Sequence, residues 1–257
     1  MWEMISEQYM IFLMIFARMT GMILFNPFLT RRSVSPYIKI GLAFFCAVIL
    51  TASLDLTQLS FSSNLMFIVA CLKELFIGFC CGVIMQLFLS VVLMAGEFID
   101  LQLGVGMGKI YDPQSNVSMP ITGSIFNLFF IISFFVVNGH LTLIKIIFYS
   151  FDILPLGPEF FNPEAWQYLT LIFSQILALA LKLALPIIAI ELVTEMGLGL
   201  LMRTVPQINV FMVGLQLKLL VGLILLVFVL PGVFGFFDSM LDQMFKEIIG
   251  VLEQMSG

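Results

Sequence analysis

The sequence has very little charge for its length. Only 11% of its 257 residues are charged and 61% are hydrophobic, with a mean hydropathy of +1.14. A soluble domain carries about a quarter charged residues. An apolar surface of this extent cannot face water, so we expect lipid or other apolar chains around it. Any function must therefore be carried out in or against a membrane.

Residues that build metal centres, active sites and nucleic-acid surfaces are also scarce. The chain has one histidine, His140, and its four cysteines lack metal-ligand spacing, so we expect no metal site and no cofactor. The cysteines lie in apolar runs and are expected to be small buried hydrophobes. There is no nucleophile with a base, no carboxylate dyad and no phosphate loop, which argues against an enzyme and names no catalytic residue. No basic stripe occurs at a net charge of −5, which excludes nucleic acid as a partner.

The N-terminus lacks the basic residues that open a secretory signal. It begins Met1-Trp2-Glu3, and its first apolar run continues beyond the length of a signal core. We therefore expect this run to be retained as a membrane segment.

What the chain does have is six long apolar runs, which predict an all-α membrane protein with one domain over residues 1–257. The second run is short for a crossing, which takes about twenty apolar residues, and the third is longer than one crossing needs. In a plain six-span model the basic residues place both termini outside the cytoplasm. Residues 238–257 are expected to form a short amphipathic helix. The runs are residues 9–25, 38–54, 65–99, 121–151 with a break at 138–140, 168–190, and 210–230.

Several charged residues fall inside these runs. A charge at a membrane helix centre costs about 2.5–3.5 kcal/mol on insertion scales, so Arg18 and Lys182 should each find a partner. We favour pairing with a neighbouring subunit over an ion or substrate pathway. Glu191 and Glu195 share one helix face, where a solvated helix end is favoured over a cation site. These charges and Pro186 in the fifth run leave open a self-sufficient secondary transporter or ion channel.

Glycines mark two further features. Gly78 and Gly82 form a G-x-x-x-G pattern, which is typical of close helix contacts in lipid. Three glycines in residues 104–108 make a poor helix and a good hinge, and a turn signal follows at 112–113. Irregular backbone at membrane depth needs protein or a water-filled cavity around it. This favours a movable plug or gate over the alternative of an exposed cytoplasmic loop. The gate residues are Gly104, Gly106, Met107, Gly108, Lys109, Tyr111, Asp112, Pro113 and Met119.

Four segments resemble the FliR/SctT family of type III secretion export apparatus proteins. The most specific is R-T-V-P-Q-I-N-V-F at residues 203–211, followed by Lys218. The segments G-E-F-I-D-L-Q-L-G at 96–104 and F-V-V-N-G-H at 135–140 are also similar to family segments, as is Arg18 followed by Gly21 and Pro27. The family often has G-Q where this chain has Gly96-Glu97. The resemblance covers nearly the whole chain.

The resemblance implies a fold of tilted helical hairpins, in which a FliP-like part is joined to a FliQ-like part. It implies a hetero-oligomeric gate with FliP- and FliQ-like proteins, next to FlhB- and FlhA-like proteins, in the inner membrane at the flagellar basal body. The cargo would be unfolded flagellar subunits, and the loop at residues 106–120 would resemble a plug. A virulence-type, SctT-like injectisome component is the alternative. Contacts between subunits or helices are expected at Arg18, Glu97, Lys182, Arg203, Pro206 and Asn209.

Overall fold

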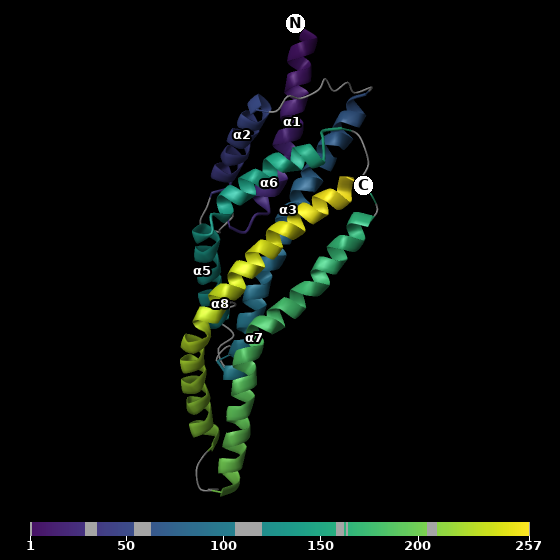
Figure 1. Ribbon diagram of the computed structural model, residues 1–257. Coiled ribbons are helices and arrows are strands. Elements are labelled where there is room, and N and C mark those ends of the chain that lie inside the picture. The colour runs from purple at the N-terminus through teal and green to yellow at the C-terminus, as the bar shows by residue number, and fades with distance from the viewer. Residues whose placement is uncertain are drawn as a thin grey trace. The chain divides into compact units, whose positions relative to one another are not determined.

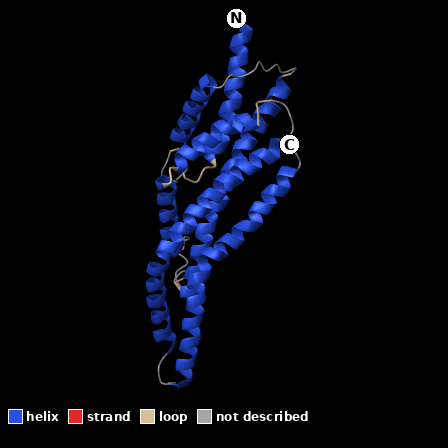
Figure 2. Cartoon of the chain, in the orientation of Figure 1, coloured by secondary structure: helices blue, strands red, loops and turns tan. Residues whose placement is uncertain are grey.

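The computed structural model consists of helices joined by turns and short loops over the residues that it describes (Figures 1 and 2). It describes residues 2–28, 35–53, 63–105, 120–157, 162, 164–204 and 210–256, and no strand occurs within these ranges. The predicted all-α class is confirmed. The helices are α1 (Trp2–Leu24), α2 (Pro36–Ser53), α3 (Asn64–Leu103), α5 (Ile121–Val136), α6 (Gly139–Ile153), α7 (Glu164–Thr204) and α8 (Val210–Ser256).

Three helices are much longer than a single crossing needs. The overlong third run is one helix, α3, of 40 residues, while α7 has 41 and α8 has 47. The sequence predicted ends at residues 190 and 230, and both predictions were wrong: α7 continues through Gly197 and Gly199 to Thr204, and α8 continues through Pro231 to Ser256. A proline removes one backbone donor, but in apolar surroundings every other backbone group still needs its helical partner. The predicted short helix at 238–257 is therefore the second half of α8.

Four helices are long and apolar enough to cross a membrane, namely α2, α3, α7 and α8. The bent pair α5 and α6 would make a fifth span if counted as one. The apolar part of α1, Gln8–Leu24, is shorter than a span. The described helices thus fall short of the plain six-span topology, and the orientation inferred from it loses its basis.

Two compact units make up the chain, and each is described by itself. The first unit comprises Met1–Phe88, Asn138–Phe173 and Asp242–Gly257, and the second comprises Leu89–Val137 and Ser174–Leu241.

In the first unit, glycines bring the backbones of α1 and α3 into contact. A Cβ atom on Gly78 would overlap the carbonyl oxygen of Arg18, and one on Gly21 would overlap that of Leu75. A Cβ on Gly82 would meet the side chain of Phe25. Both glycines of the G-x-x-x-G pattern therefore face α1, which confirms the close helix contact predicted from it.

Arg18 lies at this contact and is buried to 2% exposure. Its Nε donates to Glu74 Oε2 at 2.6 Å, and its Nη1 and Nη2 donate to the carbonyl oxygens of Ser150 and Leu154 at 2.8 and 2.9 Å. The guanidinium also lies 4.2 Å from the ring centroid of Phe151. These carbonyls close the last turn of α6, where a cation is favourable. One side chain thus joins α1, α3 and α6, and its partners are within the chain.

The C-terminal part of α8 also belongs to the first unit. Its buried residues recur at helical spacing, as the sequence predicted. Tyr168, near the start of α7, donates to Glu247 Oε2 at 2.7 Å, and Gly250 leaves room for the tyrosine ring. The buried residues of this segment are Met244, Phe245, Ile248, Val251, Leu252 and Met255.

Replacing Arg18 by Met should destabilise the chain by about 3–5 kcal/mol, because it leaves the Glu74 carboxylate buried and uncompensated. The measurement is thermal unfolding of the purified full chain in mild detergent. The double variant R18M/E74M removes both charges and should recover most of the loss. Arg203→Met is the matched control, since Arg203 is exposed at the end of α7. A melting temperature for R18M equal to that of R203M would contradict this role.

Candidate functional site

The predicted gate covers residues 104–120, of which 106–119 lie outside the described residues, and these include eight of its nine predicted residues. The ninth, Gly104, is described, together with Val105 and Pro120. The candidate site is therefore the pair of loop ends that flank residues 106–119, at the end of α3 and the start of α5.

The first loop end is a left-handed turn at Gly104. Its φ is +78°, a region that glycine adopts without the steric cost paid by other residues, and its N–H donates to the carbonyl oxygen of Leu101 at 3.2 Å. The predicted hinge thus begins at a residue whose left-handed backbone conformation favours glycine.

A lysine from α8 holds this loop end. Lys218 Nζ donates to the carbonyl oxygen of Gln102 at 3.4 Å and lies 3.1 Å from Glu195 Oε1 on α7. The side-chain amide of Gln102 also donates to Glu195, at 3.4 Å. Carbonyls in the last turn of a helix lack intrahelical partners and carry partial negative charge, so a cation here satisfies and stabilises the end of α3.

The second loop end is held by a carboxylate from α3. Asp100 Oδ2 accepts from the N–H of Ile121 at 2.6 Å, and Oδ1 accepts from the N–H of Thr122 at 3.2 Å and from its hydroxyl. The residue before α5, Pro120, offers no side-chain cap. Asp100, only 3% exposed, takes the place of that cap and sets a negative charge at the positive end of the helix.

Two glycines bring α3 and α5 together next to this cap. A Cβ on Gly96 would overlap the backbone of Gly123. In the same unit, Phe126 and Phe130 pack edge-on against Phe237 of α8, with ring centroids 6.2 and 5.3 Å away. Both loop ends are therefore fixed to neighbouring helices of the second unit.

The predicted contact residues do not gather at one place. Arg18 is buried in the first unit, whereas Glu97, Lys182 and Arg203 are exposed. None of these three has a salt bridge within the described ranges. Pro206 and Asn209 lie outside the described residues.

Sequence reasoning missed Asp100, Gln102, Glu195 and Lys218 as residues of the loop ends. The sequence did contain a signal for one of these four residues. Asp100 lies in the last turn of α3, where the helix dipole disfavours an acid, so it had to have a partner elsewhere. That partner is the N–H of Ile121, 21 residues further along the sequence, and no hydrophobic periodicity in the sequence connects the two positions.

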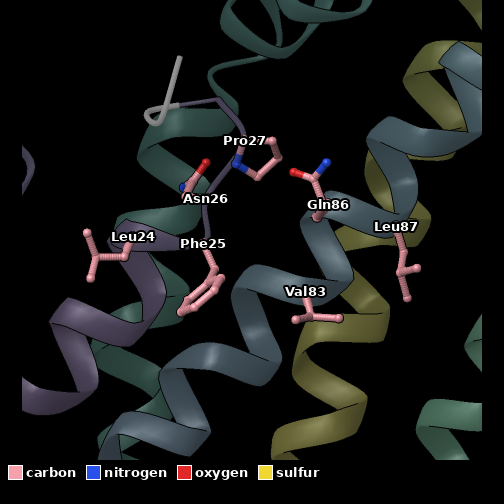
Figure 3. Close-up of a pocket in the computed structure, with 7 residues that line it drawn as sticks. All are labelled: Leu24, Phe25, Asn26, Pro27, Val83, Gln86 and Leu87. Carbon is pink, nitrogen blue, oxygen red and sulfur yellow. The ribbon is translucent and has the colours of Figure 1, made fainter. Parts of the chain in front are cut away.

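One cavity in the first unit, of about 260 Å³, opens between the end of α1 and the middle of α3 (Figure 3). Asn26, one of its two polar residues, uses its side-chain oxygen to accept from the N–H of Phe28 at 2.9 Å. The lining has no titratable group, so the cavity does not support catalysis. It is lined by Leu24, Phe25, Asn26, Pro27, Val83, Gln86 and Leu87. No group of three metal-binding side chains occurs in the described part of the chain.

Comparison with known proteins gives a consistent picture. A family model described as bacterial export proteins, family 1, matches residues 9–244. The flagellar biosynthetic protein FliR of Escherichia coli K12 is 31% identical over 99% of both chains. FliR of Bacillus subtilis 168 is 31% identical over 90% of both chains. The surface presentation of antigens protein SpaR of Shigella flexneri is 30% identical over 82% of both chains.

Replacing Gly96 by Ala should destabilise the chain by about 1–3 kcal/mol, because the new methyl group forces α3 and α5 apart. Thermal unfolding of the full chain in detergent measures this loss. Gly235→Ala is the matched control, since a Cβ at this α8 position meets nothing within 4 Å. There the added methyl should be neutral or slightly stabilising. Equal melting temperatures for the two variants would contradict the close contact.

Proposed function

Because the chain belongs to the bacterial export proteins of family 1, we propose that it works as a component of flagellar type III protein export. The observation that carries this conclusion is the family match over residues 9–244, together with flagellar relatives that align over nearly the full length of both chains. The chain is a transport component and not an enzyme. Its cargo is unfolded flagellar subunits that cross the inner membrane at the flagellar basal body.

The injectisome alternative has one specific observation in its favour. SpaR of Shigella flexneri is about as similar in identity as the FliR proteins, at 30%. The aligned share favours flagellar cargo, since FliR of Escherichia coli aligns over 99% of both chains and SpaR over 82%.

Within this function, residues 104–120 serve as a plug in the export channel. Support comes from the two loop ends: the segment leaves α3 through a glycine turn and returns to α5 under the Asp100 cap. A segment that narrows a pore and then moves aside needs ends that are attached to the surrounding helices. The proposed plug residues are Gly104, Gly106, Met107, Gly108, Lys109, Tyr111, Asp112, Pro113 and Met119.

The chain functions as one part of a larger assembly. Large apolar side chains remain exposed on α2, α7 and α8, and Glu97 and Lys182 are exposed on long apolar helices. A charge in such a position needs a partner, because lipid offers none. We assign this role to FliP- and FliQ-like subunits, with FlhB- and FlhA-like proteins alongside. The whole of residues 1–257 acts as one gate domain of tilted hairpins, with a FliP-like and a FliQ-like part.

Deleting residues 107–118 should raise the leak of small ions through the assembled gate, because the obstruction is removed. Ion flux into sealed inner-membrane vesicles that carry the assembly measures the leak. A same-length replacement of 107–118 by Gly and Ser separates the loss of obstruction from strain on the loop ends. An unchanged leak in both variants would count against the plug.

Replacing Lys182 by Gln should lower the recovery of FliP- and FliQ-like proteins with the tagged chain about tenfold, the equivalent of about 1.4 kcal/mol. The reason is that a partner carboxylate in the assembly loses its cation. Co-purification in mild detergent, followed by quantitative blotting, is the measurement. Lys246→Gln is the control, because Lys246 is an exposed charge on the amphipathic end of α8. A chain that stays monodisperse alone and binds a small solute would favour the transporter alternative.

A further inference from the structure

Glu191, on α7, is a buried acid that the proposed function does not use. Its side chain has no exposure, and neither carboxylate oxygen has a hydrogen-bond partner among the described residues. The carboxyl group lies against Gly222 of α8, where an added Cβ would come 3.2 Å from Oε1 and would overlap the side chain of Leu103. The carboxyl group therefore lies where α7, α8 and the end of α3 meet, next to the first loop end at Gly104.

Two charged groups act on Glu191, and both are already engaged. Glu195 is one helical turn further along α7, and Lys218 projects from α8. The Lys218 amine bonds to Glu195 Oε1 and to the carbonyl oxygen of Gln102. From α3 the neighbour is the apolar Leu103, while the Asp100 carboxylate is bound to the start of α5. Among the described residues, no cation therefore pairs with Glu191.

Glu74 is the informative comparison within the same chain. It is buried to the same degree, but Arg18 lies 2.6 Å from its carboxylate. Burial of an ionised carboxylate without a donor is far more costly than burial of the neutral acid, so such a group takes up a proton instead. The negative charge of Glu195 one turn away adds to that cost.

We propose that Glu191 is a proton-binding site, a carboxylic acid that stays neutral at neutral pH directly beneath the loop end. A sister subunit cannot supply the missing cation to this conformation, because the side chain has no exposed surface. A metal ion would need further ligands, and no group of three candidate side chains occurs in the described part of the chain. The proton is the one ligand that needs neither space nor additional donors.

Loss of this proton would change the first loop end. It would create a second carboxylate one helical turn from Glu195 and so draw Lys218 toward α7, away from the carbonyl oxygen of Gln102. Proton occupancy would then be coupled to the position of Gly104. This coupling rests on the proposed gate, whereas the proton site itself does not.

Infrared spectroscopy of the full chain in detergent tests the site directly. The carbonyl stretch of a protonated carboxyl group is separate from the bands of an ionised one. At neutral pH the wild type should show this stretch, and E191Q should lose it. E97Q is the matched control and should keep it, because Glu97 is an exposed acid on α3 and its replacement leaves the Lys218–Glu195 pair intact. A wild type without the band, or an E191Q spectrum that retains it, would overturn the proposal.

Thermal unfolding is a second test of the protonation state of Glu191, independent of the infrared spectrum. E191Q replaces a neutral acid by a neutral amide of the same size, so its melting temperature should match the wild type. If Glu191 were instead ionised and paired with Lys218, E191Q and K218M would each lower the melting temperature, and the double variant would lower it no further. That outcome would overturn the proton site.

Ion flux in vesicles then reports on the coupling. When the pH is raised, the leak through the wild-type assembly should increase. The E191Q assembly should keep the low leak that the wild type shows at neutral pH. A leak that rises equally in both forms would remove the coupling and leave the proton site and the export function standing.

Discussion

A charged side chain inside this apolar chain must either find a partner in protein or be neutralised by a proton, because lipid supplies no partner. The described structure follows this constraint at three places. Arg18 meets Glu74 and the end of α6, Asp100 meets the start of α5, and Lys218 meets the end of α3. In each case a charged side chain satisfies a helix terminus or a buried charge. The three contacts determine which helices stay together and where the loop at 106–119 begins and ends.

Close backbone contact makes these pairings possible. Arg18 can reach Glu74 because Gly21 and Gly78 let α1 and α3 touch, and Asp100 can reach α5 because Gly96 and Gly123 do the same. In membranes small residues replace the hydrophobic effect as the means of bringing helices together, since lipid tails are as apolar as side chains. The glycine contacts and the charged contacts therefore depend on each other.

Helices and other local features can be predicted well from the sequence, whereas contacts between distant residues can be predicted poorly. Apolar runs predict the helices, the G-x-x-x-G pattern predicts the contact at Gly78, and the glycine cluster predicts the turn at Gly104. Pro231 and the glycines after residue 190 led to wrong helix ends, because such signals say nothing about the apolar surroundings that keep a helix continuous. The partners of Arg18 and Asp100 could not be read, since they lie 56 and 21 residues away with no periodicity to connect them. Whether the loop itself obstructs a channel stays a prediction, because its residues are not described.

The charged contacts differ in how easily each ion pair breaks, and this difference matters for the proposed plug. The Arg18 and Glu74 side chains are 3% and 0% exposed, so removing one partner costs about 3–5 kcal/mol. The Lys218 and Glu195 side chains are 18% and 55% exposed, and solvated pairs contribute only about 0–1 kcal/mol. A thermal fluctuation therefore breaks the second pair more readily than the first. The contact that Lys218 makes at the end of α3 is therefore more easily broken than the contact of Arg18 between α1 and α3. Glu191, the proposed proton site, lies one helical turn from Glu195, so its charge acts on the same lysine that holds this weaker contact.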